Sequence, residues 1–219
     1  MLLSIEKKFI FIHIPKTAGS SVTEVLSPYA LNPVKSQYRR LLSHLPVPEN
    51  PERAWFRIHD KAYWIRLKLP RAMFEGFHTF AAVRNPYDYA VSYYAFQRGN
   101  PRSRRFREAQ NTSFLEFLTY MEKKDRLSGI SQTSWITDLR GRIIIDELLR
   151  FETIERDFAG LAARLGLETS LPHVNKSDRG DYREMYGTAE RDIADRLFAR
   201  DLELLGYDFD GPVAGKGAR

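Results

Sequence analysis

Two short apolar runs in this chain each end in a polar loop that opens a helix. The first run is KFIFIHI at residues 8–14, which Pro15 breaks, and the second is HTFAAV at residues 78–83. Continuous apolar runs of this length are typical of strands buried on both faces. In folds built from such strands, ligands bind at the carboxyl ends of the strands, so the two loops are the expected places for chemistry.

The rest of the chain alternates in the same way, and a third strand is predicted at residues 142–146. Helices are predicted at residues 20–28, 86–98, 114–124, 153–165 and 188–205. Strands that alternate with helices predict an α/β fold with a mainly parallel central sheet flanked by helices. For a chain of 219 residues we expect one domain over residues 1–210 and a flexible tail over residues 211–219.

The composition excludes several kinds of site. The chain has no cysteine, which excludes disulfides, cysteine-ligated metals and thiol nucleophiles. Its five histidines are scattered, without a pair at metal-ligand spacing, so we expect no metal site. No apolar run is long enough to cross a bilayer. The opening stretch carries its lysines inside the apolar run, unlike a signal peptide, and a cytoplasmic protein is the expectation.

The charge balance favours anionic partners. Lysine and arginine number 34 against 28 aspartates and glutamates, a formal net charge of +6. Nucleotides, nucleic acids and acidic glycans all fit this excess. A cluster of arginines follows the helix predicted at 86–98. These arginines either guide an acidic acceptor to the site or form a solvated surface. The members of the cluster are Arg98, Arg102, Arg104, Arg105 and Arg107.

The loop after the first strand has the chemistry of a phosphate site. It offers Lys16, hydroxyl side chains, Gly19 for a close approach of the backbone to the anion, and the N–H groups of a helix start. Ser20 and Ser21 are residue types that cap helices. The loop lacks the Walker A spacing, because Lys16 precedes the glycine. A capped turn with an exposed lysine is the structural alternative.

The loop after the second strand supplies another cation and another hydroxyl. Arg84 ends the strand, Pro86 is suited to open the next helix, and Ser92 lies eight positions after Arg84 on that helix. An arginine and a hydroxyl that converge can bind a second phosphate. The alternative is that Arg84 pairs with Asp88 while Ser92 faces solvent.

Taken together, FIHIPKTAGSS and AAVRNPYDYAVSYY resemble the two phosphate-binding signatures of sulfotransferases. The resemblance is to the branch with the Golgi carbohydrate sulfotransferases and their soluble bacterial relatives. Residues 57–63, 145–158, 171–186 and 200–209 are similar to further parts of the family pattern. The resemblance implies a P-loop-NTPase-like three-layer fold and the donor PAPS (3′-phosphoadenosine 5′-phosphosulfate), with PAP as its product.

The resemblance also implies roles for particular residues. Arg84 and Ser92 would hold the 3′-phosphate of PAPS, and the late basic loop would close over it with Lys176, Ser177 and Arg179. Lys16 would stabilise the charge that develops on the leaving phosphate. The 5′-phosphosulfate would lie on Lys16, Thr17, Ala18, Gly19, Ser20 and Ser21.

The base that takes the acceptor's proton is expected to be His59, because histidine titrates near neutral pH and His59 precedes an amphipathic helix. A capping or core histidine is the other interpretation of His59, and His13 is expected to be packed in the first strand. In the family, lysine precedes this histidine and Ala-Thr-Ala usually follows it. Here Ile58 and Asp60-Lys61-Ala62 stand there instead.

The sequence therefore predicts a sulfotransferase that moves a sulfuryl group from PAPS to a hydroxyl, most readily of a carbohydrate or glycolipid. Its partners would be a nucleotide donor and a hydroxyl acceptor such as an acidic glycan, without specific nucleic-acid binding. Three alternatives stay open: an ATP-dependent kinase or P-loop NTPase, a basic nucleic-acid-binding protein, and a relative that binds PAPS without turnover.

Overall fold

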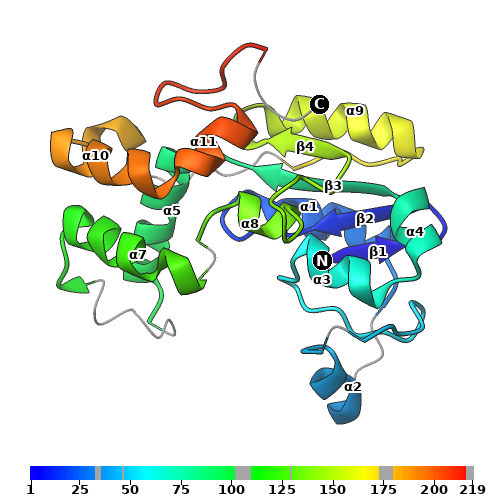
Figure 1. The fold of residues 1–219 in the computed structure, drawn as a ribbon. Helices are drawn as coiled ribbons and strands as arrows, with labels where there is room; N and C mark the ends of the chain where they lie inside the picture. Colours follow the sequence, from blue (N-terminus) through cyan, green and yellow to red (C-terminus); the bar gives the residue numbers. More distant parts are fainter. Residues whose placement is uncertain (33–35, 46, 102–109, 129, 173–179, 216–219) are drawn as a thin grey trace. The chain divides into compact units, whose positions relative to one another are not determined.

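The computed structural model describes residues 1–32, 36–45, 47–101, 110–128, 130–172 and 180–215 (Figure 1). The chain forms two compact units. The first contains Met1–Val83 and Ser134–Val174, and the second contains Arg84–Thr133 and Asn175–Ala218. A single domain over residues 1–210 stays a prediction.

The first unit is built on a four-stranded sheet. Its order is β1-β2-β3-β4, with β1 antiparallel to β2 and the other neighbours parallel. The strands are β1 (Leu2–Ser4), β2 (Phe9–Ile12), β3 (His78–Val83) and β4 (Glu147–Arg150). This confirms the predicted α/β fold with a mainly parallel sheet. Because β2 and β3 are parallel, the chain leaves both at the same edge of the sheet.

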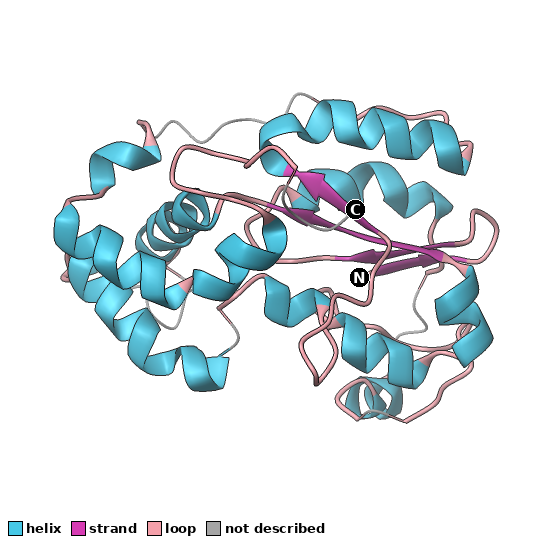
Figure 2. Cartoon of the chain, turned by 45° about the horizontal axis from the view of Figure 1, so that its top comes forward, coloured by secondary structure: helices cyan, strands magenta, loops and turns pink. Residues whose placement is uncertain are grey.

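Alternation along the strands divides the core of the first unit between two faces. Phe9, Phe11 and Phe80 pack in one cluster with residues of α1 (Gly19–Leu26) and α9 (Ile154–Leu165). Ile10 and Ile12 point to the opposite face and are also fully buried. Helices α3 (Ala62–Lys68) and α4 (Arg71–Gly76) lie on that side of the sheet (Figures 1 and 2). Burial of each such side chain contributes about 1.5–3 kcal/mol.

The strand predicted at residues 142–146 is wrong, because β4 begins only at Glu147. Ile143 makes an isolated antiparallel bridge with Thr137. Asp146 then accepts hydrogen bonds from the backbone N and Oγ1 of Thr79, at 2.8 and 2.7 Å. The chain therefore joins the sheet beyond Asp146. The shorter elements of this region are η1 (Ser27–Tyr29), α2 (Gln37–Leu42), α8 (Thr133–Ile136) and η2 (Phe151–Thr153).

The second unit is helical. Its elements are α5 (Pro86–Gly99), α7 (Phe114–Ser128), η3 (Tyr182–Met185), α10 (Thr188–Leu197) and α11 (Ala199–Leu205). Buried aromatic rings of Tyr87, Tyr94, Phe117 and Phe198 form much of its core. The single helix predicted over residues 188–205 is two helices, which meet at Phe198. Within the described ranges, none of the helices has the length and apolar character needed to span a bilayer.

Candidate active site

The loop between β2 and α1 has an unusual backbone. Lys16 and Ala18 both adopt left-handed conformations, each with φ 65°, which costs a residue other than glycine about 1–2 kcal/mol. Between them, Thr17 is fully buried and its Oγ1 donates to the carbonyl of Ile14 at 2.9 Å. Turns that use left-handed residues can direct successive N–H groups to one side and form an anion-binding hollow. Strain of this kind is typical of functional loops.

Helix α1 begins earlier than its hydroxyl residues suggest. Its N-cap is Ala18, and no side chain caps the helix, so the expectation that Ser20 or Ser21 caps it is wrong. Ser20 is exposed and Ser21 is half-buried in the first turn. An N-terminus without a side-chain cap keeps its backbone donors and positive dipole end for an anion.

Gly19 is required by its contact with His13. A Cβ built on Gly19 would lie 2.1 Å from Cδ2 and 2.2 Å from Nε2 of the His13 ring. Real Cβ atoms are never that close to another heavy atom, so any other residue here would displace the ring. In the structure, therefore, the group that lies close to Gly19 is the ring of His13, which follows the end of β2.

Gly19→Ala is expected to lower the free energy of unfolding by about 1–3 kcal/mol, the usual cost of overpacking. Chemical denaturation measures the loss. Gly76→Ala is the matched control, because a Cβ at Gly76 meets nothing within 4 Å. Adding His13→Ala to Gly19→Ala removes the obstructing ring, so the double variant should cost less than the sum of the single ones. Simple additivity would contradict the assigned contact.

His13 and His59 form a pair beside this loop. The Nδ1 atom of His59 lies 3.0 Å from the carbonyl oxygen of His13, and the two rings are 4.7 Å apart. A carbonyl only accepts hydrogen bonds, so Nδ1 of His59 carries a proton and Nε2 of the neutral ring is the basic atom. Burial, reinforced by the neighbouring His59, lowers the pKa of His13 to about 3. His13 is therefore neutral at physiological pH.

A buried ion pair anchors the turn that carries His59. Asp60 is fully buried and accepts hydrogen bonds from the backbone N and the Nε of Arg57, at 3.0 and 2.7 Å. The buried ammonium of Lys68 lies 3.7 Å from the same carboxylate. Asp60 is one of the residues at which the sequence departs from the family pattern. Its role is to hold the turn, which keeps His59 against His13.

Trp135 borders the histidine pair within the same unit. Its ring lies 6.1 Å from that of His59, and the ammonium of Lys61 is 5.8 Å from it. Its Nε1 is buried and has no hydrogen-bond partner among the residues that the structure describes. No spacing rule in the sequence pointed to this contact.

Arg84 begins the second unit, and its side chain is held firmly. It is 7% exposed, and its Nε and Nη2 both lie 2.6 Å from Oδ2 of Asp88. The pairing that the sequence allowed as an alternative is thus present. Ser92 is 9% exposed, so it does not face solvent as that alternative required. Asp88 and Ser92 are one helical turn apart on α5 and share a face.

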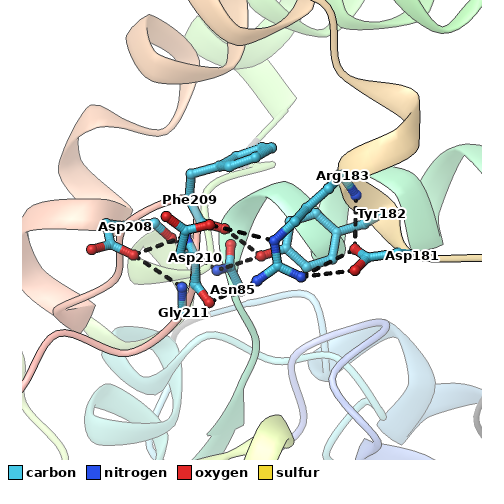
Figure 3. A network of polar contacts seen from close by, with 8 residues as sticks. All are labelled: Asn85, Asp181, Tyr182, Arg183, Asp208, Phe209, Asp210 and Gly211. Carbon is cyan, nitrogen blue, oxygen red and sulfur yellow. Dashed lines mark hydrogen bonds and ion pairs between the residues drawn. The ribbon is translucent and has the colours of Figure 1, made fainter.

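Asn85, the next residue, ties the start of α5 to two distant segments (Figure 3). Its Oδ1 caps Tyr87 at 3.0 Å, and its Nδ2 donates to the carbonyl of Asp208 at 2.9 Å. The hydroxyl of Tyr182 lies 3.4 Å from Nδ2 and donates to the carbonyl of Phe209. Pro86 is in the first turn of the helix, as predicted. These bonds keep the residue after Arg84 in one place.

Several predicted residues lie outside the described ranges: Lys176, Ser177, Arg179, Arg102, Arg104, Arg105 and Arg107. Of the arginine cluster, Arg98 is described. Its Nη1 donates to the hydroxyl of Tyr94 at 3.1 Å, and it lines a cavity of about 530 Å³ with Val91, Tyr94 and Met185. In the part of the chain with described positions, there is no group of three or more acidic or histidine side chains that could bind a metal ion.

Arg150 is a cation that sequence reasoning missed. It is the last residue of β4 and pairs in register with Val83, at the edge where the chain leaves the parallel strands. Its backbone N donates to Asp157 at 3.0 Å. Because the predicted strand ended at residue 146, four residues before Arg150, nothing in the sequence placed this guanidinium at the edge.

This chain is similar to a known family and to several known proteins. The model of the sulfotransferase family matches residues 1–208. The crystal structure of mouse sulfotransferase SULT7A1 complexed with PAP has a TM-score of 0.54 at 16% identity, covering 92% of this chain and 86% of the mouse chain. A sulfotransferase from Alicyclobacillus acidocaldarius has a TM-score of 0.40 at 18% identity, covering 89% and 96% of the two chains. An uncharacterized protein of Archaeoglobus fulgidus is 27% identical over 125 residues, 57% of this chain and 98% of that protein.

The match over 1–208 shows that the chain belongs to the sulfotransferase family. The likeness to the mouse structure shows the same fold. Members of this family take their sulfuryl group from PAPS, and this chain is accordingly a PAPS-dependent sulfotransferase. The resemblance stated from the two sequence motifs is confirmed at the level of the family.

Proposed function

We propose that this enzyme transfers the sulfuryl group of PAPS to a hydroxyl of a carbohydrate or glycolipid. The observation that carries the transfer step of the proposal is the position of His13. Its ring occupies the space beside Gly19 of the loop, and its carbonyl binds Nδ1 of His59. A base candidate is thereby linked to the loop that is proposed to hold the donor. The family match does not favour the kinase or nucleic-acid alternatives.

The donor is proposed to bind through both loops. The left-handed backbone at Lys16 and Ala18 and the uncapped start of α1 support binding of the 5′-phosphosulfate by residues 16–21. The buried Arg84 and Ser92 support binding of the 3′-phosphate. The roles of Lys176, Ser177 and Arg179 stay predictions from the resemblance.

In the proposed reaction, the acceptor oxygen attacks the sulfur of PAPS. The new oxygen–sulfur bond forms as the bond from sulfur to the bridging oxygen breaks, and PAP leaves with that oxygen. The acceptor's proton passes to Nε2 of His59, the basic atom defined by the bond from Nδ1 to His13. Lys16 stabilises the negative charge that builds on the leaving phosphate.

The proposed acceptor is an acidic glycan. The motifs resemble the carbohydrate branch of the family, and the net charge of +6 together with Arg98 favours an acidic glycan. A cytoplasmic location is proposed from the sequence alone.

A panel of acceptors tests this part of the proposal. The enzyme and radiolabelled PAPS are incubated with a desulfated acidic polysaccharide, a galactosyl lipid, a small phenol and a tyrosine peptide. We expect label on the polysaccharide or the lipid. Label confined to the phenol or the peptide would contradict the carbohydrate assignment and leave sulfuryl transfer intact.

A further inference from the structure

The side chain of Gln132 forms hydrogen bonds with both backbone polar groups of Arg84. Its Oε1 accepts from the backbone N of Arg84 at 2.9 Å, and its Nε2 donates to the carbonyl oxygen of Arg84 at 2.8 Å. Gln132 is fully buried. One side-chain amide thus satisfies both backbone groups of one residue, as a neighbouring strand would. Because Arg84 directly follows the end of β3, this contact holds the backbone where the sheet no longer does.

Asp201 in turn holds Gln132. Asp201 lies on α11 and is fully buried. Its carboxylate accepts from the backbone N of Gln132 at 2.7 Å and from the backbone N of Thr133 at 2.9 Å. The hydroxyls of Ser131 and Thr133 each donate to Oδ1 at 2.6 Å. Four donors meet a carboxylate that is removed from water, which ties residues 131–133 to α11.

The side chain of Arg84 is held separately from its backbone. Asp88 accepts from Nε and Nη2, while Gln132 holds the N–H and the carbonyl. An arginine that is fixed at both ends loses little freedom when it binds a phosphate, so more of the binding free energy is retained. The functional group is thereby preorganised by residues that need not contact the ligand.

We propose that Gln132 and Asp201 are positioning residues for Arg84, and that they set the preference of the enzyme for nucleotides that carry a 3′-phosphate. This inference rests on the proposed role of Arg84 in the donor site. It predicts that loosening the backbone of Arg84 weakens recognition of the 3′-phosphate while binding of the rest of the nucleotide is retained.

The test compares the dissociation constants of PAP and adenosine 5′-phosphate, which differ only by the 3′-phosphate. Calorimetry is performed on the wild type, on Gln132→Met and on Gln97→Met. Gln132→Met keeps the side-chain length but removes both hydrogen bonds. Gln97 is another buried glutamine of the same unit and serves as the control. We expect Gln132→Met to weaken PAP binding about tenfold, with less than a twofold change for adenosine 5′-phosphate. Gln97→Met should keep the wild-type ratio.

Thr133→Val provides a milder variant, because it removes one hydroxyl donor to Asp201 without changing the side-chain shape. The ratio of the dissociation constant of adenosine 5′-phosphate to that of PAP should fall about threefold in this variant. If Gln132→Met does not fold, Thr133→Val tests the inference instead. If the wild type prefers PAP and a folded variant keeps the same ratio, the positioning role of Gln132 and Asp201 is overturned, while the proposed donor-site role of Arg84 is not. A wild type without any preference for PAP would overturn the donor-site role of Arg84 and this inference with it.

Discussion

Lys16→Ala is expected to lower kcat/KM for PAPS by about 10²–10³-fold, the usual loss when one group that stabilises transition-state charge is removed. The reason is that the ammonium is proposed to face the phosphate that leaves during sulfuryl transfer. Steady-state transfer from labelled PAPS measures the change. Retention of more than about a third of the wild-type kcat/KM would contradict the role of Lys16.

The chain offers a matched control for this change. Lys8 is also a lysine in a left-handed conformation, with φ 50° against 65° for Lys16, and it precedes β2 where Lys16 follows it. Lys8→Ala removes the same side chain under the same backbone restriction at the opposite end of the strand. It should leave kcat/KM unchanged, so any general effect of the substitution is separated from the loss of a catalytic charge.

The second large effect is expected for His59→Asn, which should lower kcat by about 10²–10⁴-fold, the range for loss of a general base. The amide N–H of asparagine can take the place of Nδ1–H against the His13 carbonyl, while the variant has no equivalent of Nε2. The turn is therefore kept and only the base is removed. PAP should bind this variant as tightly as it binds the wild type, which calorimetry would show.

His44→Asn is the control for His59→Asn. The Nδ1 of His44 also lies near a backbone carbonyl, that of Arg40 at 2.9 Å, but His44 is exposed after α2. It should keep the wild-type kcat. If His59→Asn retains kcat while Lys16→Ala loses it, His59 is a structural histidine and the base lies elsewhere.

Local patterns were sufficient to predict the elements that frame the site. The apolar run at 78–83 coincides with β3, and Pro86 after a capping Asn85 marks the start of α5. These signals depend on neighbours in sequence, so they can be read directly. The third strand was misplaced because ELLR at 147–150 has no β-branched residue, whereas the three isoleucines before it are strong strand formers. The contact of Asp146 with Thr79 decides where the sheet begins.

The chemical character of the two loops could also be predicted from the sequence. The tertiary contacts that hold the loop residues in place could not. The contact of Gly19 with His13 depends on the left-handed turn between them, and the bond from His59 to His13 joins residues 46 positions apart. Gln132 reaches Arg84 across 48 positions and is itself held by Asp201. Such contacts arise from tertiary packing, for which a single sequence carries no periodic signal.

The most direct test of the account is a thermal melting titration of the wild type with PAP and with ADP, both without magnesium. Ligand at about 100 times its Kd adds about 2.7 kcal/mol of stability, a rise in Tm of about 5–10 °C for a protein of this size. We predict that rise with PAP and none with ADP at the same concentration, because only PAP carries the 3′-phosphate that Arg84 and Ser92 are proposed to bind. No rise with PAP, or equal rises with both nucleotides, would contradict the donor site described here.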